Sequence, residues 1–135
     1  MSETVTSVGR ADVELRLPAD SAYASVLRTT TAGLAARLDF TIDDIEDLRI
    51  AVGEANAMVL EHADPGTDLV CEFYLATGKM TVTVAVETAL APVPDLDSFA
   101  WQVLSTLATS ADFTSTDGRF AVSMTMHSSA GGAGL

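Results

Sequence analysis

The sequence predicts an α+β domain in which an antiparallel or mixed sheet packs against helices on one face. Apolar residues recur at helical spacing in some segments and alternate with polar residues in others. These segments follow one another in the order strand, helix, helix, strand, strand, helix, strand. The length of 135 residues favours one domain with a sizeable core.

The first half of the chain contains one predicted strand and two predicted helices. The strand covers 13–17, where apolar and polar residues alternate before a proline. Apolar residues at helical spacing predict a helix over 21–38. A second helix is predicted over 42–63, because the Thr41 hydroxyl can cap its first turn and a Pro-Gly pair follows it.

The second half contains three predicted strands and one predicted helix. The runs 69–76 and 80–87 are joined by three residues that include a glycine, so we expect an antiparallel hairpin. A loop with two prolines then leads to a helix over 98–108. An Asp-Gly turn begins the last strand, 119–127, where apolar and polar residues alternate again.

These elements define the expected domain limits. The ordered domain covers 13–127, preceded by a flexible N-terminus at 1–12. Residues 128–135 are nearly all Ser, Gly and Ala, which bury too little side chain to become ordered, so a flexible tail is expected.

Composition excludes several broad classes of protein. Seven Lys and Arg against 19 Asp and Glu give a net charge of −12, so the basic surface that nucleic-acid binding requires is missing overall. Residues 1–12 do not resemble a signal peptide, and no run approaches the ~20 apolar residues that span a bilayer. We expect a cytoplasmic protein with no membrane segment and no direct nucleic-acid binding.

Few residues are of the kinds that make a catalytic or metal site. The sequence has no glycine-rich phosphate loop, no HExxH motif and no glycine-flanked serine. His62 and His127 lie far apart and are expected at a helix end and a strand end on the surface. Cys71, the only cysteine, is expected to be a buried apolar thiol. We therefore predict no metal site and no hydrolase.

The helix from Ile45 to Ala63 carries the most specific motif. It reads I-E-D-L-R-I-A-V-G-E-A from its first residue, and ends in His-Ala. Together with Leu17-Pro18-Ala19 and Val122 to Thr125, it resembles the anti-sigma factor and serine-protein kinase family of the RsbW and SpoIIAB type. The likeness spans about 13–127 and is greatest to the actinobacterial branch. It implies the Bergerat fold of the histidine-kinase-like (GHKL) ATPases, which agrees with the predicted element order.

The resemblance assigns a catalytic position that this chain only partly keeps. The family's general base is a helix glutamate, which Glu54 matches; a solvated helix carboxylate is the alternative interpretation. The family's metal-ligating Asn follows four residues later, where this chain has Met58. A thioether is a poor ligand for Mg²⁺. Asn56 points about 200° around the helix from Glu54, so it is an unsuitable substitute.

The other nucleotide-binding positions also depart from the family. In the adenine-binding Asp-x-Gly box, Glu87 replaces the acid and Ala89 the glycine. The glycine-rich lid aligns with Ser98-Phe99-Ala100-Trp101, which lacks the glycines that let backbone amides approach phosphate. We therefore expect no cofactor, with Mg-ATP bound only if this degenerate site still works.

The resemblance implies protein partners. Arg28 matches an arginine through which family members contact the sigma factor or its antagonist, although an ordinary surface arginine is equally compatible with the sequence. The antagonist implied is an anti-anti-sigma factor of the STAS type. A homodimer through the sheet edge and the first helix is also implied.

Three functional hypotheses follow. We favour an anti-sigma factor that sequesters an alternative sigma factor, of the stress or sporulation type, by protein contacts and with an eroded nucleotide site. Its acidity would steer it toward a basic partner, but also serves solubility. The second hypothesis is an active ATP-dependent serine kinase that phosphorylates an anti-anti-sigma factor. The third is a non-sigma binding module or a ligand sensor, with Phe99 and Trp101 lining its cleft.

Overall fold

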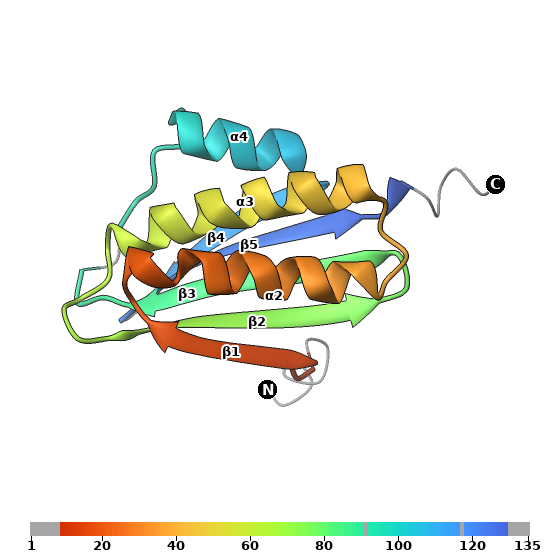
Figure 1. Ribbon diagram of the computed structural model, residues 1–135. Coiled ribbons are helices and arrows are strands. Elements are labelled where there is room, and N and C mark those ends of the chain that lie inside the picture. Colours follow the sequence, from red (N-terminus) through yellow and green to blue (C-terminus); the bar gives the residue numbers. More distant parts are fainter. Residues whose placement is uncertain (1–8, 91, 117, 130–135) are drawn as a thin grey trace.

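The expected α+β class is confirmed by the computed structural model, which describes residues 9–90, 92–116 and 118–129. One antiparallel sheet has the strand order β1-β2-β3-β5-β4, and the helices lie together on one of its faces (Figure 1). The strands are β1 (Val13–Pro18), β2 (Asp68–Ala76), β3 (Lys79–Glu87), β4 (Ser110–Thr116) and β5 (Arg119–His127). The helices are a 3-10 turn (Ser21–Tyr23), α2 (Ala24–Ala36), α3 (Ile42–Leu60) and α4 (Phe99–Leu107).

Strand β4 is the element that the sequence analysis missed. It lies at the sheet edge and is exposed at every second residue, while Ala111, Phe113 and Ser115 are only half-buried. Such a strand gives a weak apolar alternation, because backbone pairing with β5 positions it more than burial does. The predicted helices also end earlier than expected: α2 ends at Ala36 and α3 at Leu60.

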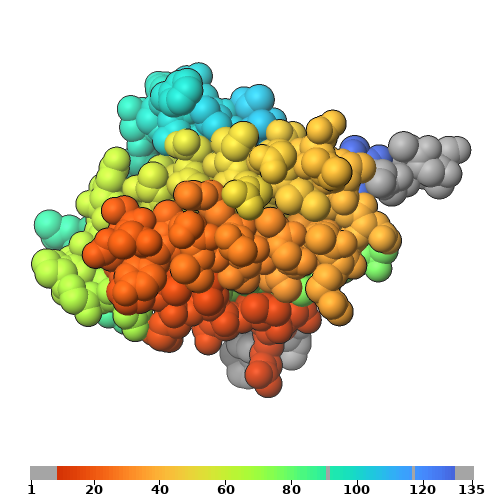
Figure 2. Space-filling model, viewed as in Figure 1, coloured from red at the N-terminus to blue at the C-terminus, as the bar shows by residue number. Residues whose placement is uncertain are grey.

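The core lies between the sheet and the helices. In the space-filling view, the helices lie side by side and hide most of the sheet (Figure 2). Its largest fully buried side chains include Phe73, Phe120, Leu27, Leu48, Met80 and Leu104. Cys71 is fully buried in β2, opposite Leu15 of β1 and Val84 of β3. Burial raises the pKa of its thiol to about 12. The expectation of a buried apolar thiol is confirmed.

Helix α3 begins with the predicted cap. The Thr41 hydroxyl accepts a hydrogen bond from the Asp44 N–H at 3.1 Å, and the Asp44 carboxylate accepts one from the Thr41 N–H at 3.3 Å. Ser129 donates two more to this carboxylate, from its N–H and its hydroxyl, both at 2.9 Å. Burial acts to raise the pKa of Asp44, but these hydrogen bonds together hold it below its usual value.

This cap makes folding stability depend on pH. Because the folded-state pKa of Asp44 is depressed, its contribution is present above the unfolded pKa and is lost as pH falls through the folded pKa. We expect the free energy of unfolding of Asp44→Asn, from urea titrations, to fall less steeply with acidification than that of the wild type. Asp43→Asn removes the same charge from the same turn and is the control. Equal slopes for all three proteins would contradict the linkage.

Near the C-terminus, two residues predicted for the flexible tail are held in place. The Ser128 N–H donates to the Gly78 carbonyl at 2.8 Å, and its hydroxyl donates to the Asp39 carbonyl at 2.9 Å. The rest of the predicted tail, 130–135, and residues 1–8 of the predicted N-terminal segment lie outside the described residues. None of the described helices is long and apolar enough to cross a membrane.

Candidate functional site

Part of the predicted nucleotide site converges on a small cavity between α3 and the start of α4. Met58 of α3 lines it together with Ser98 and Ala100. The other lining residues are Glu61, His62, Pro94, Asp95 and Phe120. The volume is about 130 Å³, whereas pockets for small molecules and cofactors usually measure about 300–1,000 Å³.

A capped helix begins at the positions that the resemblance aligns with a glycine-rich lid. The Ser98 hydroxyl accepts a hydrogen bond from the Trp101 N–H at 3.2 Å and so caps α4. The loop before it is tied to β4, since the Ser115 hydroxyl donates to the Pro92 carbonyl at 2.6 Å. These residues therefore form the first turn of a helix with its own hydrogen bonds.

Histidine 62 forms part of the cavity wall. Its ring meets Phe120 edge to face, with ring centroids 5.4 Å apart. His62 is half-buried just beyond the end of α3, while His127 is exposed at the end of β5, so the expected helix-end and strand-end positions are confirmed. From the sequence, His62 was noted as part of the helix motif and as a helix-end residue, but it was assigned no place in the candidate site.

The candidate general base, Glu54, lies near the small cavity in the sequence of α3 but does not line it. Glu54 is half-buried on α3, one turn before Met58, but is not among the cavity-lining residues. Asn56 faces elsewhere: it is 4% exposed, and its Oδ1 atom has no hydrogen-bond partner within the described part of the chain. This orphaned amide escaped the sequence analysis, which compared Asn56 only with a metal-ligand position.

Glu87 is exposed at the end of β3 and lies apart from Met58. Its neighbour Val86 belongs to the core, so by strand alternation Glu87 points to the sheet face opposite the helices. There it lines a separate, open cavity of about 390 Å³ with Arg16 and Arg119. The acid proposed for adenine and the methionine at the metal position therefore line two different cavities.

The two lid aromatics behave differently. Trp101 is half-buried and meets Phe113 edge to face, with centroids 6.1 Å apart. Phe99 is 80% exposed. Neither side chain lines the small cavity.

These residues do not fit Mg-ATP. At the position that the resemblance assigns to a metal-ligating Asn, Met58 offers a thioether instead of a hard oxygen donor, and the cavity of about 130 Å³ is smaller than the pockets that usually hold cofactors. Among residues 9–90, 92–116 and 118–129, no cluster of three or more His, Cys, Asp or Glu is arranged to hold a metal ion.

Arg28 is half-buried in α2 and lies across Gly53 of α3. A β-carbon built at Gly53 would lie 3.6 Å from Arg28 Cδ and 3.8 Å from its Nη1. Within the described ranges, no carboxylate lies within 4.0 Å of the Arg28 guanidinium. Its five donors are thus available to a partner.

The contact between Arg28 and Gly53 leads to a stability prediction. An alanine at 53 meets Arg28 at ordinary van der Waals distance and is a better helix former than glycine. We expect Gly53→Ala to raise the free energy of unfolding by about 0.5–1 kcal/mol, measured by urea denaturation. Gly33→Ala, at an exposed α2 position with nothing within 4 Å of the added carbon, should give a similar gain. Destabilisation at 53 alone would show that Arg28 needs the glycine.

Comparison with known sequences identifies relatives over half of the chain. No protein-family model matches. The chain is 42% identical to the serine-protein kinase RsbW of Halalkalibacterium halodurans over 73 residues, which cover 53% of this chain and 45% of the relative. It is 37% identical to the serine-protein kinase RsbW of Bacillus thuringiensis over 76 residues, 54% of this chain and 47% of that one. The chain spans about half the length of these curated relatives.

Solved structures agree on the fold. The chain is similar to the structure of the RsbU and RsbW domains of a Mycobacterium tuberculosis protein, with a TM-score of 0.66 and 15% identity. The match covers 86% of this chain and 31% of that one. The histidine kinase AdeS of Acinetobacter baumannii matches over 95% of this chain and 73% of its own, with a TM-score of 0.52 and 7% identity. These likenesses confirm the predicted histidine-kinase-like fold.

Proposed function

Because this chain is related in sequence to the RsbW serine-protein kinases, as its helix motif predicted, we propose that it is an anti-sigma factor that holds an alternative sigma factor by protein contacts alone. The observation that carries the nucleotide-independent part is Met58 in a cavity of about 130 Å³. A hard-oxygen ligand is replaced there, and the remaining space is below that of a nucleotide pocket.

Arg28 supports the sigma-binding role. Its side chain is braced against Gly53, so less side-chain freedom is lost when the guanidinium pairs with a partner carboxylate. The net charge of −12 adds long-range attraction to a basic partner. An anti-anti-sigma factor of the STAS type would compete for this surface and release the sigma factor.

A homodimer belongs to the same proposal. Strand β1 is an edge strand, and among the described residues no further strand pairs with its outer side; α2 lies in the layer of helices above it (Figure 1). Light scattering coupled to gel filtration should give about twice the mass of 14.1 kDa. A monomeric mass at micromolar concentration would remove this part of the proposal and leave sigma binding intact.

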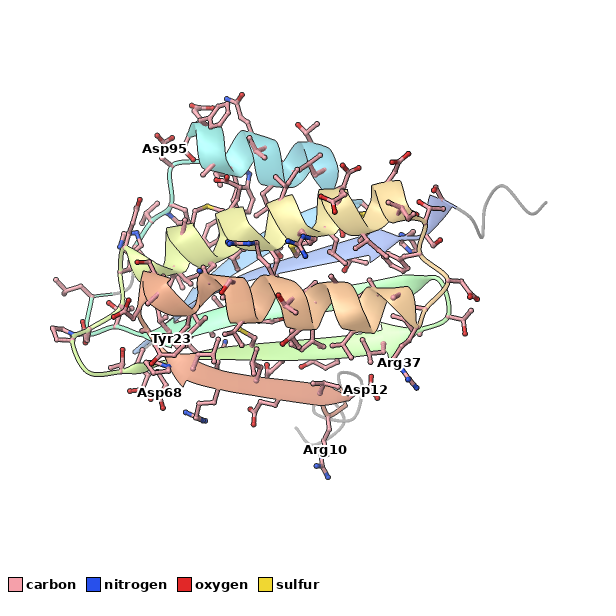
Figure 3. The ribbon with its side chains drawn as sticks, in the orientation of Figure 1. Arg10, Asp12, Tyr23, Arg37, Asp68 and Asp95 are labelled. Atoms are coloured by element: carbon pink, nitrogen blue, oxygen red, sulfur yellow. The ribbon has the colours of Figure 1, made fainter. Side chains whose placement is uncertain are left out.

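The test compares charge reversals at the two ends of α2. Tagged protein recovered from its own cells without added nucleotide should retain a sigma factor, which Arg28→Glu should abolish. Arg37→Glu, an equal charge change just after the far end of α2 (Figure 3), should bind as the wild type. Calorimetric titration with Mg-ATP should give no dissociation constant tighter than about 100 μM.

Each other outcome favours a named alternative. A sigma factor recovered only after ATP is added, together with tight ATP binding and phosphate transfer to a serine of the antagonist, would establish the kinase, for which Glu54 is the candidate base. Recovery of a different class of regulator would favour the non-sigma binding module. A protein that binds neither partner but binds a small molecule would be a ligand sensor.

A further inference from the structure

An apolar segment is exposed between β3 and α4. Leu90 is 84% exposed, Val93 92%, Leu96 50% and Phe99 80%. These four are half of the eight exposed large hydrophobic residues described, yet they fall within ten positions of the chain. Exposed apolar residues this close in the chain can form one contiguous surface, and contiguous apolar surfaces mark contact sites more often than scattered residues do. We refer to these four residues as the apolar segment.

The surroundings of the apolar segment are acidic. Asp95 and Asp97 fall within the apolar segment itself, and no Lys or Arg occurs between Lys79 and Arg119. Asp95 lies just before α4, at the end of the loop that enters this helix (Figure 3). Glu61 lines the same small cavity as Asp95, and neither carboxylate forms an ion pair within the described residues. A partner for this surface should therefore bring positive charge.

The small cavity is lined in part by residues of the loop that carries the apolar segment, and its size and lining suit a single side chain. Met58, Pro94, Ala100 and Phe120 give it apolar walls, and the two carboxylates give it an acidic rim. Its volume of about 130 Å³ is roughly four times the ~30 Å³ that one water occupies in the liquid, which is the scale of one long side chain. An Arg or Lys can bury its aliphatic stem on such walls while its charge remains at the rim.

We propose that this cavity receives an Arg or Lys side chain from a basic amphipathic helix of a protein partner, while Val93, Leu96 and Phe99 contact the apolar face of that helix. The surface lies next to α4, whereas Arg28 lies in α2, so it is a second contact region. That the partner is the sigma factor rests on the proposed function; the chemistry of the helix does not.

The test uses a synthetic probe, so that it does not depend on knowing the partner. The probe is an 18-residue amphipathic helix of Leu, Ala and Arg, with a matched peptide in which citrulline replaces every Arg. Fluorescence anisotropy with the full chain should show binding of the arginine peptide and at least tenfold weaker binding of the citrulline peptide. Phe99→Ser and Glu61→Lys should each weaken the arginine peptide at least fivefold.

Two matched controls separate this surface from general acidity. Ile42→Ser changes a side chain that is 79% exposed, against 80% for Phe99. Glu46→Lys reverses the charge of an exposed residue in α3, the helix that Glu61 follows. Glu46 does not line the cavity. Both should stay within twofold of the wild type. Equal losses in controls and test variants, or no loss in any variant, would overturn the inference.

The sigma factor from the pull-down gives the second arm. If it binds and Arg28→Glu abolishes binding, but Phe99→Ser and Glu61→Lys have no effect on either ligand, the proposed function stands and this inference fails. If no sigma factor binds but the arginine peptide shows the expected pattern, the inference stands and the proposed function fails.

Discussion

Replacing Asn56 by Leu is expected to raise the free energy of unfolding by about 1–3 kcal/mol. The side chain is 4% exposed and its Oδ1 has no hydrogen-bond partner in the described part of the protein. A buried acceptor without a partner keeps its full desolvation cost, and a branched apolar side chain removes that cost. Urea denaturation of the two proteins measures the difference.

Thr31→Val is the matched control. Thr31 is fully buried in α2, but its hydroxyl donates to the Leu27 carbonyl at 2.8 Å. Loss of this satisfied group should leave stability unchanged or lower it by up to about 1 kcal/mol. A destabilised Asn56→Leu together with a stabilised Asn56→Ala would indicate overpacking. If both Asn56 variants are destabilised, the amide is making an interaction that the fold requires.

Phe120→Ala is expected to lower the free energy of unfolding by about 3–5 kcal/mol. Phe120 is 1% exposed in β5, and its ring packs against His62 and, at 6.4 Å between centroids, against Phe113. Truncation would join a new void to the small cavity, so the surrounding side chains cannot close it fully. The loss should appear in the midpoint of urea denaturation.

The control for this truncation is Phe99→Ala. It removes the same ring from a position that is 80% exposed, so stability should stay within about 0.5 kcal/mol of the wild type. A similar loss in both variants would mean that the apolar segment is packed in solution. A loss at Phe120 below about 1 kcal/mol would mean that the site collapses around the void.

The sequence predicted most of the fold because most elements bury a regular apolar stripe. The start of α3 could be predicted from Thr41, because a threonine hydroxyl before a helix can accept a hydrogen bond from a backbone N–H of the first turn. The hairpin could be predicted from Gly78, because glycine readily adopts a positive φ, and Gly78 has a φ of 71° in the turn. Strand β4 was missed because its partner strand, rather than its own side chains, determines its position.

The candidate site was less predictable. Met58, Ser98 and Ala100 were singled out from motif positions, and the fold brings them to one cavity. The side of β3 on which Glu87 lies depends on the register of that strand end, where Thr88 is buried and Glu87 exposed. Neither the contact of Arg28 with Gly53 nor the isolation of Asn56 leaves a local signal, since each depends on how two helices pack.

The single thiol, buried in the sheet, allows local unfolding of the protein to be measured by its chemical modification. Cys71 is fully buried between two neighbouring strands, and a thiol with a pKa of about 12 provides almost no thiolate at neutral pH. A thiol reagent therefore modifies the chain only while the middle of the sheet is open. The rate of modification by a concentrated reagent measures how often that opening occurs, without denaturant and without a label added by mutation.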